Sequence, residues 1–231
     1  ILFLALSLVI VVDACAQQPS TKNQRLLSNT EVIDLRQHNW GDGEIHSLEG
    51  SWSFAWQLFT HDATDTQVKT WEKVYVPGSW NQKFSEVPGT HQALPPKGYG
   101  TYYKEIWVPE NLEKVYIYLP DMASAYELWS NNTRLGGNGI IATDKEHETP
   151  AYLPRVYELT PQNGRVELFI KTSNFHYQWG GIWYAPRITD ASGVHSIRDI
   201  PILKATTSAT ILLGTAIFCL LIFLSRPKDK K

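Results

Sequence analysis

The stretch with the most chemical potential is residues 173–186, SNFHYQWGGIWYAP. Its rings and amides come from Asn174, Phe175, His176, Tyr177, Gln178, Trp179, Trp183 and Tyr184. Aromatic faces stack on flat or sugar-like ligands, and amides hydrogen-bond hydroxyl groups. The same rings are also large enough to fill a corner of a hydrophobic core. The stretch is therefore either a binding site or a structural brace.

The position of this stretch favours binding. It follows an alternating segment, Arg165–Thr172, so it begins at a strand end, where the loops of a sandwich gather and ligands often bind. We expect Phe175 and Trp183 to anchor the loop in the core. The predicted ligand-binding residues come from this loop and from the PGSWN motif: Trp80, Asn81, Asn174, His176, Tyr177 and Trp179. The alternative, in which the whole loop is a brace, remains open.

Other chemistry has weaker sequence support. Glycoside hydrolysis usually needs two carboxylates that flank one bond, and the densest acidic cluster is Asp144, Glu146 and Glu148 in TDKEHET. This polar run ahead of Pro150 is predicted to be a solvated loop, so we predict no catalytic residue and no enzyme activity for this fragment.

Metal binding is not predicted either. The seven histidines are scattered and form no HExxH pattern, and both cysteines lie in the apolar terminal segments. We expect no metal site and no cofactor.

The first sixteen residues resemble a signal peptide. Twelve apolar residues, ILFLALSLVIVV, are too few to span a bilayer and suit the apolar core of such a peptide. Ala14-Cys15-Ala16 fits a cleavage site, and Cys15 alternatively fits a lipid attachment site. No Met precedes this segment, so we expect the chain to be part of a longer gene product.

The other end of the chain predicts a transmembrane helix. Ala205–Leu224 contains twenty residues without a charge, which as a helix would measure about 30 Å, the thickness of the hydrocarbon layer. The basic flank at 225–231 is expected to stay in the cytoplasm. This places residues 17–204 in the periplasm and the helix in the inner membrane.

Between the two ends, the pattern is that of an all-β domain at 31–190, preceded by a polar linker at 17–30 and followed by a juxtamembrane linker at 191–204. Val115–Leu119 and Arg165–Lys171 alternate with period two, as strands do. Ala125–Leu135 predicts a hairpin that turns at Asn131-Asn132. Only Ser53–Thr60 is expected to form a short helix. We predict a jelly-roll sandwich whose core includes Trp52, Trp56, Trp71 and Trp129.

Five motifs in fixed order carry a family resemblance: LEGSWSFAWQLF, WEKVYVPGSWN, GYGTYYKEIWVP, MASAYELWSNNTRLGGNG and VELFIKTSNFHYQWGGIWYAPRI, within residues 48–188. They resemble the galactose-binding-like jelly roll that is the sugar-binding domain of family 2 glycoside hydrolases. The resemblance is closer to the extracellular sensor domain of bacterial seven-transmembrane receptors with diverse intracellular signalling modules. It implies that the helix at 205–224 is the first of seven, and that a diguanylate cyclase or histidine kinase output domain follows.

These observations favour the sensor domain of a membrane signalling receptor with a carbohydrate or related small polar ligand. The alternatives are a non-catalytic carbohydrate-binding or protein-interaction module and a fragment of a membrane-tethered glycosidase. A homodimer is an open expectation. With a net charge of −2, the chain lacks the basic footprint of a nucleic-acid-binding protein, so we expect no nucleic-acid partner.

Overall fold

A computed structural model describes residues 32–81, 94–122 and 124–225. The signal-peptide-like segment, the polar linker at 17–30 and nearly all of the basic flank lie outside the described residues. The chain divides into two compact units with a boundary between Arg198 and Asp199, and we describe each unit separately.

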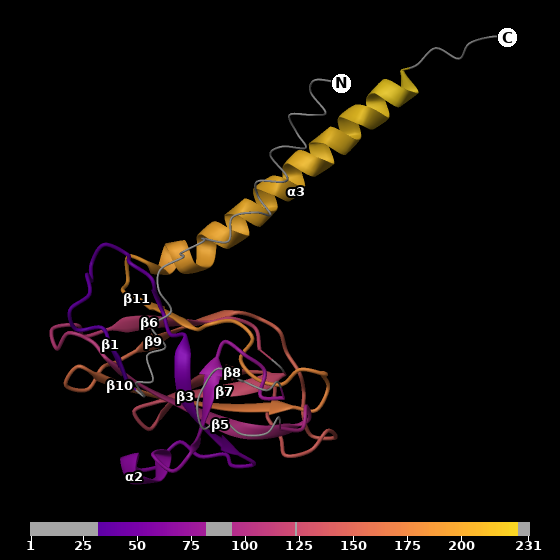
Figure 1. Ribbon diagram of the computed structural model, residues 1–231. Coiled ribbons are helices and arrows are strands. Elements are labelled where there is room, and N and C mark those ends of the chain that lie inside the picture. Colours follow the sequence, from indigo (N-terminus) through magenta and orange to yellow (C-terminus); the bar gives the residue numbers. More distant parts are fainter. Residues whose placement is uncertain (1–31, 82–93, 123, 226–231) are drawn as a thin grey trace. The chain divides into compact units, whose positions relative to one another are not determined.

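The unit before this boundary is a sandwich of two β-sheets (Figure 1). The larger sheet has the order β4–β3–β5–β10–β7–β8, with β1 beside β5, and the smaller has the order β2–β11–β6–β9. The strands of the larger sheet are β1 (Val32–Asp34), β3 (Gly50–Trp56), β4 (Glu72–Val76), β5 (Gly98–Trp107), β7 (Ala125–Ser130), β8 (Thr133–Asn138) and β10 (Arg165–Asn174). Those of the smaller sheet are β2 (His46–Ser47), β6 (Val115–Leu119), β9 (Arg155–Leu159) and β11 (Arg187–Thr189). The prediction of an all-β sandwich is confirmed.

The long central strands β5 and β10 organise the larger sheet. They pair antiparallel from Arg165↔Trp107 to Asn174↔Gly98, and β10 also pairs with β7. Because successive side chains of a strand point to opposite faces, β10 contributes to both faces of the sheet. Its end at Asn174 places the aromatic stretch at one end of the sandwich.

The space between the sheets holds the main core. In β6 the buried and half-buried residues alternate, as the period-two pattern predicts. The core draws large side chains from both sheets, among them Trp52, Phe54, Tyr102, Ile117, Leu119, Leu128, Leu168, Ile170 and Ile188. A second cluster lies on the outer face of the larger sheet and contains Val68, Tyr103 and Phe169, with Ala63, Trp71 and Trp129 packed against it.

The predicted tryptophan core is confirmed in outline, and it is divided between these two clusters. Trp52 is buried in the main core and Trp56 packs against it, whereas Trp71 and Trp129 belong to the outer cluster.

The hairpin prediction is confirmed. Strands β7 and β8 are joined at Asn131 and Asn132, whose φ angles are 45° and 61°. Two consecutive residues with positive φ are the hallmark of a type I′ turn, which Asn tolerates well. The Asn131 amide also donates to the Thr160 carbonyl at 3.0 Å and accepts from the Glu167 N–H at 3.0 Å.

The helix expected at Ser53–Thr60 was a wrong prediction, because the first half of this segment belongs to strand β3 and the second half is a turn and irregular chain. The short helix is instead α2 (Asp65–Val68), which covers the outer face of the larger sheet (Figure 1). Thr64 and Gln67 form a capping box, in which each side chain bonds the other residue's backbone N–H. Val68 from this helix is buried in the outer cluster.

The helix α3 (Val194–Leu224) is the last described element. Its segment Ala205–Leu224 is long and apolar enough to cross a membrane, and none of its residues is buried. The helix begins at Val194 and therefore includes most of the segment predicted as a juxtamembrane linker.

The two hydrogen bonds of Asn131 predict its contribution to stability. Asn131→Ala should lower the free energy of unfolding by about 1–3 kcal/mol, because it leaves the partners of two bonds unsatisfied and places Ala at a positive φ. Thermal unfolding followed by tryptophan fluorescence measures this, with the exposed neighbour Thr133→Ala as the control. Equal melting temperatures for the two variants would contradict the stabilising role of the Asn131 side chain.

Candidate functional site

Asn174, the last residue of β10, holds the start of the aromatic stretch. Its side chain is completely buried. The amide donates to the carbonyls of Pro96 at 2.8 Å and Tyr177 at 3.1 Å, and it accepts from the Tyr177 N–H at 3.0 Å. Since both polar atoms of Asn174 are engaged within the protein, this residue shapes the turn at 174–177.

The middle of the stretch is held against the PGSWN motif. Backbone bonds join Gly78 to Ile182 at 2.7 Å and Trp80 to Gly180 at 3.0 Å. The Asn81 carbonyl oxygen accepts from the Gly180 N–H at 3.0 Å, and its amide donates to the Gln178 carbonyl at 3.0 Å. The two segments, a hundred residues apart in the sequence, therefore form one rigid base.

Glycine is required where these segments meet. A Cβ at Gly180 would lie 2.2 Å from Cε2 of the Trp80 ring, and Gly181 has a φ of +111°. Trp80 itself is buried, stacks on Phe54 at 5.8 Å, and donates its indole N–H to the Pro95 carbonyl. Trp80 is thus a core residue that supports the loop from below.

Three aromatic side chains project from this base into solvent. The exposed fractions are 40% for Tyr177, 45% for Trp179 and 59% for Tyr184. A shallow hollow of about 410 Å³ is lined by Gly78, Ser79, Trp179, Trp183 and Tyr184. Large exposed rings beside a concavity are typical of a surface that stacks on a ligand.

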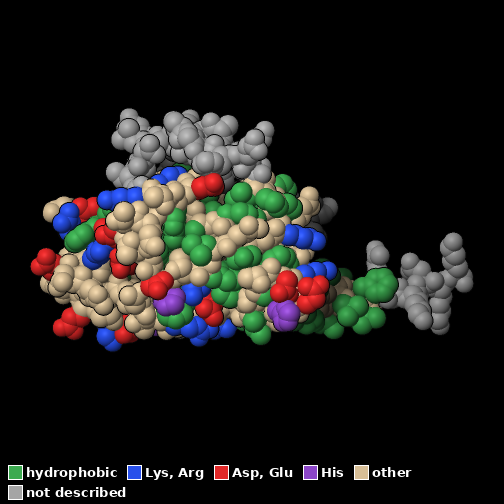
Figure 2. Space-filling view, turned by 90° about the horizontal axis from the view of Figure 1, so that it is seen from below, with side chains coloured by type: hydrophobic (Ala, Val, Ile, Leu, Met, Phe, Trp, Pro, Cys, Tyr) green, Lys and Arg blue, Asp and Glu red, His purple; other side chains and the backbone are tan. Residues whose placement is uncertain are grey.

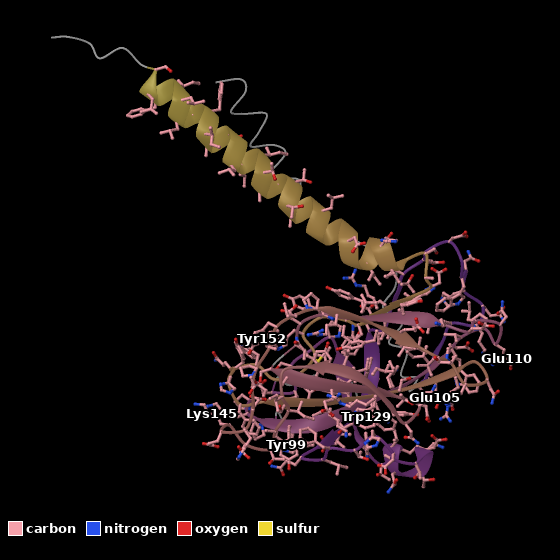
Figure 3. The ribbon with its side chains drawn as sticks, turned by 180° about the vertical axis from the view of Figure 1, so that it is seen from behind. Tyr99, Glu105, Glu110, Trp129, Lys145 and Tyr152 are labelled. Atoms are coloured by element: carbon pink, nitrogen blue, oxygen red, sulfur yellow. The ribbon has the colours of Figure 1, made fainter. Side chains whose placement is uncertain are left out.

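Several buried polar atoms in this region have no hydrogen-bond partner among the residues that the structure describes. They include Glu148 Oε1, the Tyr152 hydroxyl and Trp183 Nε1. The Tyr152 and Tyr177 rings are 5.0 Å apart, and those of Tyr177 and Trp183 are 6.0 Å apart. Burial raises the pKa of Tyr152, and the adjacent Tyr177 raises it further, so its hydroxyl remains a hydrogen-bond donor at neutral pH. In Figure 3, Tyr152 and Lys145 lie at the opposite end of the sandwich from Glu110.

Glu148 corrects the prediction of a solvated acidic loop. Its side chain has no exposed surface, whereas those of Asp144 and His147 are 43% and 80% exposed. Glu148 Oε2 accepts from the Phe175 N–H at 2.8 Å and lies 3.6 Å from His176 Nε2. The prediction failed because this burial depends on a long-range contact with residue 175, which a polar run in the sequence does not reveal.

The six predicted ligand-binding residues thus fall into two structural groups. Trp80, Asn81 and Asn174 hold the loop through internal bonds, while His176, Tyr177 and Trp179 are exposed. Phe175 and Trp183, which we expected to anchor the loop, are half-buried. Sequence reasoning missed Glu148 and Tyr152, both of which come from the segment before β9.

A separate acidic cluster lies on the outer face of the larger sheet. Carboxylate oxygens of Asp65, Glu105 and Glu167 lie within 4.8 Å of one another. Arg165 Nη2 contacts them at 2.9, 2.5 and 3.0 Å. Burial acts to lower the pKa of Arg165, but the hydrogen bonds that it donates to Glu105 and Asp65 raise it overall. The guanidinium therefore offsets part of the negative charge of the cluster and ties α2 to β5 and β10.

Lys171 occupies a comparable position farther along β10. Its ammonium nitrogen lies 4.6 Å from the centroid of the Trp129 ring and 3.1 Å from His61 Nδ1. Burial lowers the pKa of Lys171. The His61 ring stacks on Trp129 at 3.7 Å, so this group packs the loop at residue 61 onto the sheet.

No family model and no curated protein matches the chain. Similar solved structures include a Ruminococcus gnavus β-glucuronidase (TM-score 0.45, 13% identity, 63% of this chain and 28% of that one). A putative β-galactosidase from Bacteroides fragilis has a TM-score of 0.43 and 16% identity, over 63% of this chain and 23% of that one. A GH2 β-galacturonidase from Eisenbergiella tayi has a TM-score of 0.43 and 14% identity, over 64% and 24%.

The chain therefore spans about a quarter of the length of these structures. TM-scores below 0.5 assign neither a family nor an activity. The functional assignment rests on the geometry of the loop.

Because the two kinds of loop residue differ in their internal bonds, substitutions at them should have unequal effects on the free energy of unfolding. Asn174→Ala should lower the free energy of unfolding by about 1–3 kcal/mol, because it removes buried hydrogen bonds. Trp179→Ala should change it by less, about 0.5–1 kcal/mol, because nearly half of that residue is in solvent and it makes no buried hydrogen bond in the described structure. Thermal unfolding of both variants checks this, and a large loss of stability in Trp179→Ala would show that the ring is a brace.

Proposed function

We propose that residues 31–190 form the extracytoplasmic ligand-sensing domain of a membrane signalling receptor, and that its ligand is a carbohydrate or a related small polar molecule. The observation that carries the ligand class is the combination of exposed rings with unpartnered polar atoms at one end of the sandwich. Trp179 and Tyr184 offer faces for stacking on a sugar ring. Trp183 lines the hollow, and its Nε1, which has no hydrogen-bond partner among the described residues, can donate to a sugar hydroxyl once a ligand rearranges the surface there.

The proposed binding surface includes the exposed members of the predicted set: His176, Tyr177 and Trp179. The roles of Trp80, Asn81 and Asn174 are to keep the loop in place. A preorganised loop favours binding, because little conformational entropy is lost when the ligand arrives. On the face that Figure 2 shows, acidic and basic side chains are interspersed, so charge steering contributes little there.

The membrane part of the proposal rests on the helix at 205–224. Its length matches the hydrocarbon layer, and its exposed side chains are uncharged and mostly apolar. In this account the domain lies in the periplasm, the helix crosses the inner membrane, and an output domain of the diguanylate cyclase or histidine kinase type follows. The five sequence motifs are the support for a galactose-binding-like jelly roll and for the receptor family.

Binding of a glycan is the direct test of the ligand class. A titration of the chain in detergent against a panel of oligosaccharides should find at least one that binds. Trp179→Ala should then weaken its binding about tenfold or more, because the loss of a central aromatic contact costs about 2 kcal/mol. Leu58→Ala is the matched control, since Leu58 is equally exposed, at 45%, and lies outside this loop. If no glycan binds, or if both variants bind equally, the carbohydrate proposal fails.

Signal transfer through α3 can be tested in a full-length receptor that carries the output domain. A flexible Gly/Ser segment inserted after Ile200 should abolish the response to ligand, because it interrupts the helix that begins at Val194. An insertion of seven helix-forming residues at the same place is the control, since it preserves helical continuity. An undiminished response in the Gly/Ser variant would contradict transfer through this segment.

A further inference from the structure

Glu148 is the most unusual polar group in the loop region. Its carboxylate has no exposed surface, and one of its oxygens, Oε1, has no hydrogen-bond partner. A buried carboxylate is costly unless a cation or several donors compensate it. Within the described ranges, no Lys or Arg lies in ion-pairing distance of Glu148. The nearest cationic candidate is His176, whose Nε2 at 3.6 Å is beyond normal hydrogen-bonding distance.

Glu148 adjoins the aromatic loop through Phe175, whose N–H donates to Oε2, and His176, and two pairs of aromatic rings follow in the same region. The rings of Tyr152 and Tyr177 meet at an interplanar angle of 77°, and those of Tyr177 and Trp183 at 78°. Burial, Tyr177 and the negative charge of Glu148 all raise the pKa of Tyr152. Aromatic ring faces and a carboxylate both present negative electrostatic potential, so together they attract an organic cation.

We infer that the ligand of this site carries a protonated amine, which pairs with Glu148 Oε1 and lies against the Tyr152 and Tyr177 rings. The inference rests on the proposed carbohydrate-binding function and narrows it to amino sugars or similar cationic ligands. The buried carboxylate supplies the charge, and the exposed rings of Trp179 and Tyr184 supply the stacking surface for the remainder of the ligand.

Access to Glu148 requires a side-chain movement. His176 and Tyr177 are the partly exposed residues next to it, with 30% of the His176 side chain and 40% of Tyr177 in solvent. Neither aromatic ring donates a strong hydrogen bond to the carboxylate in the unbound protein. Rotation of one of them lets an ammonium group reach Oε1, and exposed side chains rotate on a timescale of picoseconds to nanoseconds.

A pair of oligosaccharides that differ only in charge tests the inference. The probes are the glucosamine tetramer, whose amines are protonated at pH 6, and its N-acetylated counterpart, which is neutral. The full chain in detergent should bind the cationic tetramer at least about tenfold more tightly than the neutral one. Glu148→Gln should abolish most of this preference. Asp144→Asn, which removes an exposed carboxylate of the same segment, should retain it.

The aromatic contribution has its own control. Tyr152→Phe keeps the ring and should keep the preference for the cationic tetramer, whereas Tyr152→Leu should reduce that preference. If Glu148→Gln does not fold, the comparison of the two tetramers on the natural chain decides alone.

The outcomes separate the inference from the proposed function. Equal affinity for the two tetramers, or a preference that survives in Glu148→Gln, overturns the amine while leaving carbohydrate binding intact. Binding of tetramethylammonium chloride, lost in Glu148→Gln, with no binding of either tetramer would support the cation site and remove the carbohydrate. The absence of binding by all three probes overturns the inference.

Discussion

The close contact between Gly180 and the Trp80 ring governs the geometry of the candidate site. A single added Cβ at Gly180 would overlap this ring at 2.2 Å, so the backbone of the loop lies directly on a core residue. The backbone bonds of Gly78 and Trp80 to the loop and the Asn81 amide fix it there. With its backbone packed inward, the loop has no internal space left for the Trp179 and Tyr184 rings, which therefore project outward.

This constraint explains how one loop can combine a brace with the recognition surface that we propose. The brace consists of Trp80, Asn81 and Asn174, whose polar atoms are consumed by internal bonds. The recognition surface consists of the side chains that these bonds hold in place. The alternatives that the sequence left open are thus divided between neighbouring residues of one segment, and a rigid base reduces the entropic cost of ordering the exposed rings around a ligand.

The sequence predicted the features that depend on residues close together in the chain. The Asn131-Asn132 turn and the alternation in β6 follow from backbone preferences and strand periodicity, and both are confirmed. The helix expected at Ser53–Thr60 was wrong because β3 is buried on both faces, which removes its alternation and makes it look like a helix. The capping box at Thr64 and Gln67 was a readable signal for α2 that we missed. The burial of Glu148 was not readable, because it depends on pairing with a segment 27 residues away.

The most direct measurement of the central claim is an NMR titration of the indole N–H signals, of which the nine Trp residues supply one each. Addition of a bound oligosaccharide should shift the signals of Trp179 and Trp183, which line the hollow. The signals of Trp52 and Trp80 should stay in place, since both rings are buried in the core. Binding that leaves Trp179 and Trp183 unshifted would contradict the account, because the ligand would then occupy another surface of the sandwich.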